Sequence, residues 1–316
     1  MALGIDGLRV GTWTAPGGTS GCTVLLPPSG TVGAMAVRGA APGTREAAAL
    51  GPAGKVDVCH GVVLSGGSAF GLATADGVTR WLEERGVGFE VATARVPIVG
   101  AAIVLDASVG DPSVRPDADA GRAACDAATD GDPAEGGVGV GAGCTVAKVA
   151  GLEHGWRGGQ GIAVVSAAGV TVGALVANNG VGELVAADGS WLARARVDDD
   201  TPRFPTHGGP IGGVPGGAVA NTVIGCVVTD AVLTKRQAHR VADLAHSGVA
   251  RALRPAHTDS DGDALFCLST GRIPATVDLV THLAAEAVEL AARRGPLAAV
   301  GHGGLPGLAD GRAPVV

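Results

Sequence analysis

Short, almost continuously apolar runs recur along the chain and limit what it can fold into. Runs of this length and composition are typical of β-strands that are covered on both faces. Because only 3% of the residues are aromatic and 54 of 316 are glycine, alanine, valine, leucine and glycine must form the core, which suits closely packed sheets. The clearest runs are Cys22–Pro27, Ala34–Arg38, Gly61–Leu64, Val99–Val104, Ile162–Ser166, Val170–Ala177, Val223–Val228 and Ala264–Ser269.

Three other segments have the periodicity of amphipathic helices. They run from about Ser68 to Glu84, from about Lys235 to Leu253 and from about Thr276 to Arg294. The last is followed by Gly295, as helix C-termini prefer. Few strands alternate strictly with helices, so we expect an α/β (α+β) fold of stacked sheets with helices outside rather than a doubly wound sheet.

Composition excludes several functional classes. The formal net charge is −7 and no cluster of five or more basic residues occurs, so we do not expect nucleic-acid binding. The apolar runs are far shorter than the roughly 20 residues of a membrane helix, and no secretory signal is visible at the N-terminus. We therefore expect a soluble, cytoplasmic protein without a membrane partner. The six cysteines include no Cys-x-x-Cys pair and are expected to be buried thiols.

The segment from Gly66 to Gly71 only superficially matches a nucleophile elbow. The pattern Gly-x-Ser-x-Gly would need a glycine at position 70, which is Phe70. We interpret the segment as a glycine turn in which Ser68 caps the following helix. The eight histidines are scattered, so the sequence leaves a Ser–His or Cys–His triad open without a local signature for one.

Two further loops fail the fingerprints of cofactor and metal sites. The glycine-rich segment Gly137–Gly143 does not satisfy Gly-x-Gly-x-x-Gly, and no Gly-Lys-Ser/Thr occurs. Asp259–Asp263 resembles the start of a calcium loop, but Ala264 and Thr270 occupy its sixth and twelfth positions instead of glycine and glutamate. We therefore expect no nucleotide, cofactor or metal.

The junction between Asn221 and Thr222 has the clearest chemical potential. The glycine- and proline-rich stretch Asp198–Gly217 precedes it, and a buried apolar run begins directly at Thr222. A structureless segment that long in a compact domain is usually functional or mobile. If the chain broke at this junction, Thr222 would carry a hydroxyl and a free α-amine, which is a nucleophile with its own base.

Several polar residues are candidates for the surroundings of this threonine. Asp261 and Asp263 lead into the last apolar run, and a spacing of two places both carboxylates on one side of an extended chain. Like charges at one place require a cation or donors between them, and a freed α-ammonium would be such a cation. Lys148 lies in an apolar stretch and either snorkels to the surface or is held for chemistry. Asn178–Asn179 either form a turn or donate to an oxyanion.

Taken together and in order, the motifs of this chain resemble one family, that of the L-aminopeptidase/D-esterases, β-aminopeptidases and nylon-oligomer hydrolases. The resemblance extends from roughly Gly21 to Gly295. It is carried by Arg38–Glu46, His60–Gly71, Arg95–Val99, Gly141–Lys148, Gly173–Asn178, Asn221-Thr222 and Asp261-Gly-Asp263.

The resemblance implies a single hydrolase domain, residues 1–316, with a four-layer α/β/β/α sandwich. The chain would be an inactive precursor that cleaves itself into Met1–Asn221 and Thr222–Val316, and the two fragments would stay together. Homo-oligomers, often tetramers of such units, are also implied. The implied function is that of a self-processing N-terminal-threonine amide hydrolase or aminopeptidase. Its substrates would be short peptides, amino-acid amides or esters, or ω-amino-acid oligomers.

The resemblance also assigns roles to single residues. Thr222 would be the nucleophile in self-cleavage and in turnover, and Asn178 would hold the oxyanion. Lys148 would help to activate the nucleophile. Asp261 and Asp263 would orient the nucleophile and bind the amine of the substrate.

One position departs from the family pattern. The family usually has tyrosine in Gly-Tyr-x-Ala, where the tyrosine lines the site, whereas this chain has Arg122 after Gly121 and contains no tyrosine. Arg122 would then donate to the same oxyanion, bind a substrate carboxylate, or leave the site weaker. The departure keeps an alternative open, a catalytically weak or inactive relative with a binding or scaffold role. A nucleotide-dependent α/β enzyme is a second alternative, against which the failed fingerprints argue.

Overall fold

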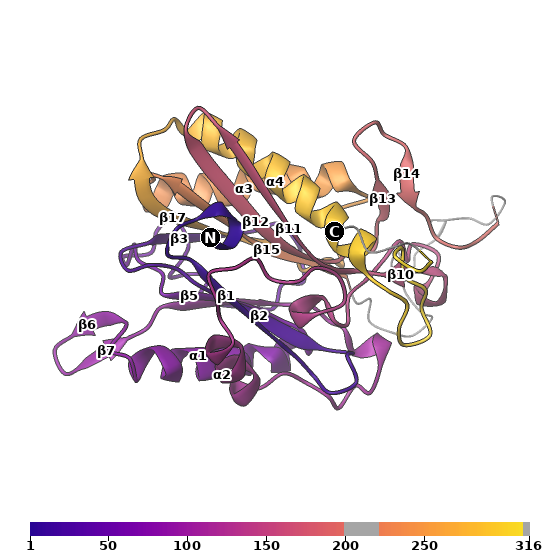
Figure 1. Cartoon of the computed structure of the whole chain (residues 1–316), viewed down its shortest axis with the longest axis horizontal. Coiled ribbons are helices and arrows are strands. Elements are labelled where there is room, and N and C mark those ends of the chain that lie inside the picture. The colour runs from indigo at the N-terminus through magenta and orange to yellow at the C-terminus, as the bar shows by residue number, and fades with distance from the viewer. Residues whose placement is uncertain (199–220, 312–316) are drawn as a thin grey trace.

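Two five-stranded sheets lie face to face at the centre of the molecule (Figure 1). The computed structural model describes residues 1–198 and 221–311. The first sheet has the order β1 (Arg9–Thr14), β2 (Gly21–Leu26), β5 (Gly61–Ser65), β8 (Val99–Ile103) and β4 (Thr44–Arg45). The second has the order β11 (Gly159–Ala167), β12 (Val170–Asn179), β15 (Thr222–Ala231), β17 (Ala264–Ile273) and β3 (Val32–Val37).

Each sheet contains one parallel pair among antiparallel neighbours. In the first sheet β5 pairs in parallel with β8, and in the second β15 pairs in parallel with β17. Parallel neighbours require a crossover connection, which usually contains a helix. The crossovers here contain α1 (Thr74–Glu83) and α3 (Lys235–Ala252), respectively.

Helices cover the outer faces of both sheets (Figure 1). The helices α1 and α2 (Ala118–Asp126) pack on the first sheet, and α3 and α4 (Val277–Ala298) pack on the second. Thr234 and Gln237 form a capping box at the start of α3, which satisfies two backbone donors that a helix N-terminus leaves free.

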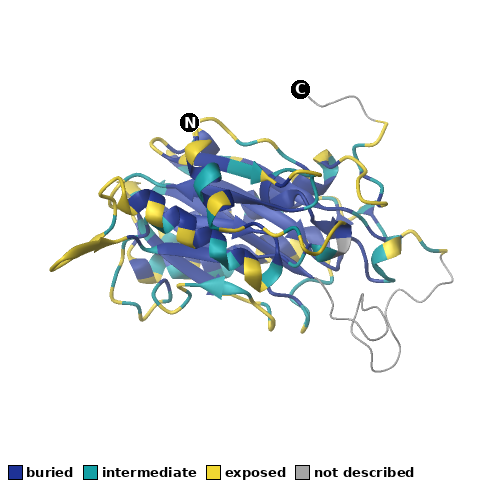
Figure 2. Cartoon of the chain, turned by 90° about the horizontal axis from the view of Figure 1, so that it is seen from below, coloured by how far each residue is buried: buried dark blue, intermediate teal, exposed yellow. Residues whose placement is uncertain are grey.

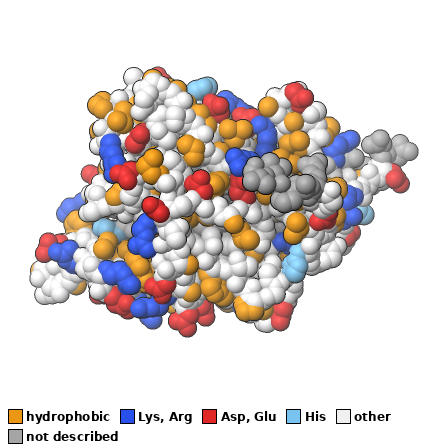
Figure 3. Space-filling view, in the orientation of Figure 1, with side chains coloured by type: hydrophobic (Ala, Val, Ile, Leu, Met, Phe, Trp, Pro, Cys, Tyr) orange, Lys and Arg blue, Asp and Glu red, His pale blue; other side chains and the backbone are white. Residues whose placement is uncertain are grey.

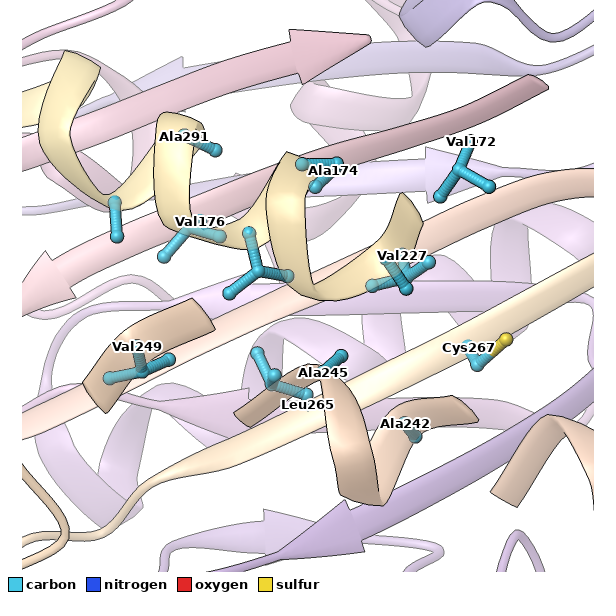
Figure 4. Packing of buried hydrophobic residues seen from close by; sticks show 14 of the residues in the cluster. Val172, Ala174, Val176, Val227, Ala242, Ala245, Val249, Leu265, Cys267 and Ala291 are labelled. Atoms are coloured by element: carbon cyan, nitrogen blue, oxygen red, sulfur yellow. The ribbon is translucent and has the colours of Figure 1, made fainter. Parts of the chain in front are cut away.

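The alternation of side chains along β15 divides the core into layers. Val223 and Val227 face the apolar layer between the second sheet and α3 and α4, where small side chains interlock (Figure 4). Ile224, Cys226 and Val228 face the layer between the two sheets. Buried residues fill the sheets, and exposed residues lie on the outer helix faces and in the connections (Figure 2).

Short elements complete the described part of the chain. The strands β6 and β7 form a hairpin that extends away from the two sheets (Figure 1). The short strands are β6 (Phe89–Val91), β7 (Ala94–Val96), β9 (Thr145–Val146), β10 (Trp156–Arg157), β13 (Glu183–Val185), β14 (Trp191–Ala193) and β16 (Leu253–Arg254). The 3₁₀ turns are Ala2–Gly4, Ser68–Ala73, Ala107–Val109, Gly139–Gly141 and Leu152–His154.

The structure confirms most of the expected elements. All eight apolar runs are strands, the three periodic segments are helical, and the predicted mixed α/β fold is confirmed. The helix α2 was not expected, and Ser68 makes no capping hydrogen bond but begins a 3₁₀ turn with a positive φ. All six cysteines are buried, as predicted. The predicted loop Asp198–Gly217 lies, apart from Asp198, outside the described residues.

The surface and the helices carry two more observations. Acidic and basic side chains are interspersed over the described part of the face in Figure 3. Within residues 1–198 and 221–311, no helix is long and apolar enough to cross a membrane.

Candidate active site

Thr222 begins the central strand of the second sheet and is buried together with Asn221. On one side Thr222 pairs with Asn179, the last residue of β12. On the other side Asn221 forms a parallel bridge with Asp261, just before β17. The junction that the sequence singled out therefore lies in the interior, between the ends of two neighbouring strands.

The carbonyl oxygen of Asn221 is contacted by two donors. The Thr222 hydroxyl donates to it, and the backbone N–H of Gly262 donates to it at 3.2 Å. The hydroxyl of the candidate nucleophile thus already touches the peptide group that would be cleaved. A backbone N–H aimed at a carbonyl oxygen is the kind of donor that stabilises an oxyanion when the carbonyl is attacked.

Close backbone packing holds this segment in place. The N–H groups of Arg38 and Ala41 donate to the carbonyl oxygens of Asp263 and Asp261 at 2.9 and 3.0 Å. A Cβ on Gly39 would lie 2.2 Å from the Asp261 oxygen. The Arg38–Glu46 motif therefore supports the two carboxylates from behind, and position 39 requires glycine because no side chain fits there.

Lys148 lies beside the end of β12, the strand that pairs with Thr222. Its buried Nζ donates to Thr145 Oγ1 at 2.8 Å and to the backbone and side-chain oxygens of Asn179 at 3.0 and 3.1 Å. Burial lowers the pKa of Lys148 to about 7, although the negative charge of Asp261 acts in the opposite direction. Near neutral pH the amine can therefore exist in both protonation states, which is the property of a general base.

The two carboxylates have different partners. Asp263 Oδ1 accepts from the Val223 N–H at 2.6 Å and so contacts the backbone directly after Thr222. Asp261 Oδ2 accepts from the Thr258 N–H at 2.6 Å. Burial first, and then the charge of Asp263, raise the pKa of Asp261 to about 6. Asp261 Oδ1 is buried and has no hydrogen-bond partner among the residues that the structure describes.

The neighbouring asparagines Asn178 and Asn179 point to opposite faces of β12, as successive strand residues do. Asn178 Nδ2 donates to the Ala292 oxygen of α4 at 2.7 Å, on the helix side of the sheet. Asn179 Oδ1 instead accepts from the Thr145 N–H at 2.9 Å and from Lys148, on the side between the sheets. The structure therefore brings Asn179, and not the side chain of Asn178, to Thr222.

Arg122 lies in a different part of the molecule. It is exposed on α2, which covers the outer face of the first sheet, and its guanidinium forms two hydrogen bonds of 2.8 and 2.7 Å with Glu84. The structure does not bring Arg122 to the cluster around Thr222. The resemblance to the short Gly-Tyr-x-Ala motif implied that Arg122 lines the site. In the structure, the helix α2 turns its side chain toward solvent instead.

Two contributors to the cluster received no role from the sequence. In the sequence, Gly262 is only the residue between Asp261 and Asp263. Its N–H can donate to the Asn221 carbonyl oxygen only because the fold brings Asn221 opposite it. His257 contacts Asp263 through its ring, but nothing local distinguishes it from the other histidines. Within residues 1–198 and 221–311, no group of three or more His, Cys, Asp or Glu side chains is placed to hold a metal ion.

A buried hydroxyl touching a carbonyl oxygen, with a lysine of lowered pKa and two carboxylates nearby, suits nucleophilic attack on a carbonyl. The fold and this cluster place the chain in the class of hydrolases that act on amide bonds. The chain belongs to peptidase family S58, whose family model matches residues 3–303.

Named relatives agree with this membership. An uncharacterized aminopeptidase of Mycobacterium leprae is 44% identical over 291 residues, which are 86% of this chain and 79% of the relative. A 6-aminohexanoate-oligomer endohydrolase of Agromyces sp. is 30% identical over 279 residues, which are 86% and 76% of the two chains. Among solved structures, a β-aminopeptidase of Burkholderia sp. superposes with a TM-score of 0.73 at 25% identity and covers 98% of this chain and 91% of its own.

Proposed function

We propose that this chain cleaves itself between Asn221 and Thr222, and that Thr222 then hydrolyses amide bonds as an N-terminal nucleophile. The contact between the Thr222 hydroxyl and the Asn221 carbonyl oxygen, in a buried cluster where Gly262 donates to the same oxygen, carries this proposal. The fragments would be residues 1–221 and 222–316 of one hydrolase domain. The stacking of two helices, two sheets and two helices supports a four-layer α/β/β/α sandwich for that domain.

In self-cleavage, Thr222 Oγ attacks the carbonyl carbon of Asn221 and loses its proton to the neutral amine of Lys148. The new C–O bond forms first and gives a tetrahedral oxyanion. The C–N bond then breaks, and the departing nitrogen takes the proton that Lys148 accepted to become the α-amine of Thr222. The Gly262 N–H stabilises the oxyanion in between. Water then hydrolyses the ester, which yields the carboxylate of Asn221 and restores the Thr222 hydroxyl.

In turnover, the α-amine of Thr222 serves as the base. Its ordinary pKa of about 7.7–8.0 suits proton transfer near neutral pH. When Asn221 has moved away after cleavage, the Gly262 N–H can donate to the carbonyl oxygen of a substrate amide. Asn179 and Lys148 hold the partner strand, while Asp263 holds the backbone after the nucleophile. The side chain of Asn178 keeps α4 against the end of β12, so its proposed part in oxyanion binding is indirect.

The proposed substrates are short peptides, amino-acid amides and ω-amino-acid oligomers. The relatives whose names include 6-aminohexanoate oligomers and β-aminopeptidase activity support this range. The buried, unpartnered oxygen of Asp261 supports it as well, because a substrate ammonium group would satisfy that oxygen. A cytoplasmic location and a homo-oligomer, such as a tetramer, stay predictions.

A catalytically weak relative is the second candidate function. The chain contains no tyrosine, and Arg122, which stands at the position of the family tyrosine, is bound to Glu84 at the surface. One oxyanion donor fewer typically lowers turnover by about 10²–10³-fold.

The intact mass after expression tests the proposal. We expect two fragments, the second beginning with Thr222, for the wild type and for Thr222→Ser, and a single chain for Thr222→Ala. A wild-type chain that stays at 30.6 kDa under every condition, with Thr222→Ala behaving identically in all assays, would contradict self-processing. A panel of aminoacyl p-nitroanilides and a linear 6-aminohexanoate oligomer then distinguishes the two candidate functions and identifies the substrate class.

A further inference from the structure

Asp263 connects the nucleophile segment to a histidine that the proposed mechanism does not use. Its Oδ1 accepts from the Val223 N–H at 2.6 Å, and its Oδ2 lies 2.6 Å from His257 Nδ1. His257 lies in the connection between β16 and β17 and has a φ of 56°. Non-glycine residues seldom adopt this conformation, so surrounding contacts hold the histidine in place against Asp263.

Both ring nitrogens of His257 face oxygen atoms. Nδ1 faces the Asp263 carboxylate, and Nε2 lies 3.2 Å from the backbone oxygen of His246 in α3. A neutral imidazole has one N–H and can donate to only one of them, whereas an imidazolium donates to both. The hydrogen-bond geometry therefore favours the cationic form.

The charges around His257 agree with this protonation state. Burial disfavours its charge, but the hydrogen bond to Asp263 and the charges of Asp263 and Asp261 outweigh it, so the pKa of His257 lies above its ordinary value. The ring of His246 meets it edge-on with centroids 5.0 Å apart. Burial lowers the pKa of His246 to about 4, and the cation Arg38 acts in the same direction. His246 is therefore neutral and adds no competing positive charge.

We propose that His257 is a positioning residue of the self-cleavage reaction, protonated at neutral pH, whose ion pair holds the Asp263 carboxylate against the backbone N–H of Val223. This inference rests on the proposed role of Thr222 as the nucleophile. The ion pair gives the two neighbouring carboxylates different tasks. Asp263 stays a fixed acceptor beside the nucleophile, and Asp261 is left to exchange a proton.

Removal of the cation would change the pH dependence of cleavage. Without that charge the pKa of Asp261 rises further, because Asp261 then ionises beside the Asp263 carboxylate with no neighbouring imidazolium. A proton on the pair weakens the hold on the Val223 N–H. For His257→Gln we expect the acidic limb of the cleavage rate to move up by about one pH unit or more, which slows cleavage about tenfold on that limb.

The experiment follows cleavage of the full chain after cell-free synthesis and transfer to buffers from pH 5 to 9. His257→Gln and His257→Phe are compared with His282→Gln, a control at an exposed position on α4, and thermal unfolding of each variant is recorded. The control should retain the wild-type profile. A His257→Gln profile that coincides with that of the wild type would overturn the inference.

Nitrogen NMR of the Thr222→Ala chain, labelled at histidine, measures the protonation state of the His257 ring independently of cleavage activity. The signals of the His257 ring are those that vanish in the double variant with His257→Gln, and we expect this ring to have two protonated nitrogens at pH 7. A neutral His257 ring at pH 7 would overturn the inference, even where His257→Phe fails to fold. Cleavage of Thr222→Ala would instead refute the proposed function, so the two failures are distinguishable.

Discussion

Gly262 offers a sharp test of the self-cleavage geometry, because a side chain at this position would crowd the predicted cut site. A Cβ at this position would lie 3.0 Å from Thr222 Oγ1 and 2.7 Å from the backbone oxygen of Ala41. The backbone angle is ordinary, so Gly262→Ala introduces crowding without the strain of a left-handed residue. The added methyl group would crowd the Thr222 hydroxyl directly.

The structure sets the size of this effect. The distance to Ala41 is 0.7 Å short of the 3.4 Å at which ordinary contact begins. Because that neighbour is backbone, either the segment before β17 that contains the Gly262 N–H or Thr222 must move by a similar distance. Overpacking of this kind costs about 1–3 kcal/mol of stability, and a misplacement of about 1 Å between reacting groups costs about 10²-fold in rate.

The assay follows the disappearance of the intact chain by mass after cell-free synthesis. We expect Gly262→Ala to slow cleavage by about 10²-fold with a moderate loss of thermal stability. Gly131→Ala is the matched control, because its Cβ would meet only Thr129 Oγ1 at 3.6 Å. Wild-type cleavage by a folded Gly262→Ala chain would refute the argument that this close approach positions the reacting groups.

Three further predictions concern charged side chains. Lys148→Met should slow self-cleavage by about 10²–10⁴-fold if the lysine is the general base, and an unchanged mass time course would exclude that role. The raised pKa of Asp261 means that the folded chain holds its proton up to about pH 6, so this group destabilises the fold as pH rises from about 4 to 6. In a Thr222→Ala background, Asp261→Asn should therefore raise the melting temperature by more at pH 7 than at pH 4. An equal change in melting temperature at both pH values would contradict this. Arg122→Ala should leave the cleavage rate and products unchanged, because its ion pair with Glu84 is exposed; slower cleavage would return Arg122 to the site.

The fold was largely predictable because its signals are local. Apolar runs indicated eight of the ten strands of the two central sheets, all except β1 and β4, and helical periodicity indicated α1, α3 and α4. The helix α2 was missed because it spans only nine residues and its buried residues are small, namely Ala120, Gly121, Ala124 and Cys125. Its N-terminus is nevertheless marked by Asp117, whose side chain accepts from the Ala120 N–H, and this capping residue is a signal that the sequence does contain.

The site was predictable only in part. Strand boundaries and residue spacing identified Thr222, Asp261, Asp263 and Lys148 as candidates, and the structure gathers them. The choice between Asn178 and Asn179 depends on the register of β12 against β15, since a shift of one residue moves every side chain to the other face. Register is a long-range property that the local sequence does not contain.

The sequence by itself determined most of the elements, the apolar character of both faces of their strands and the hydroxyl at the start of a buried strand. Only the tertiary structure decided what surrounds that hydroxyl. The Gly262 N–H, 41 positions further along the chain, reaches the Asn221 oxygen because β15 and β17 lie in parallel with this register. His257 reaches Asp263, and Arg122 remains on the opposite outer layer, for the same reason. Chemical roles depend on distances between atoms, and packing of distant segments sets those distances.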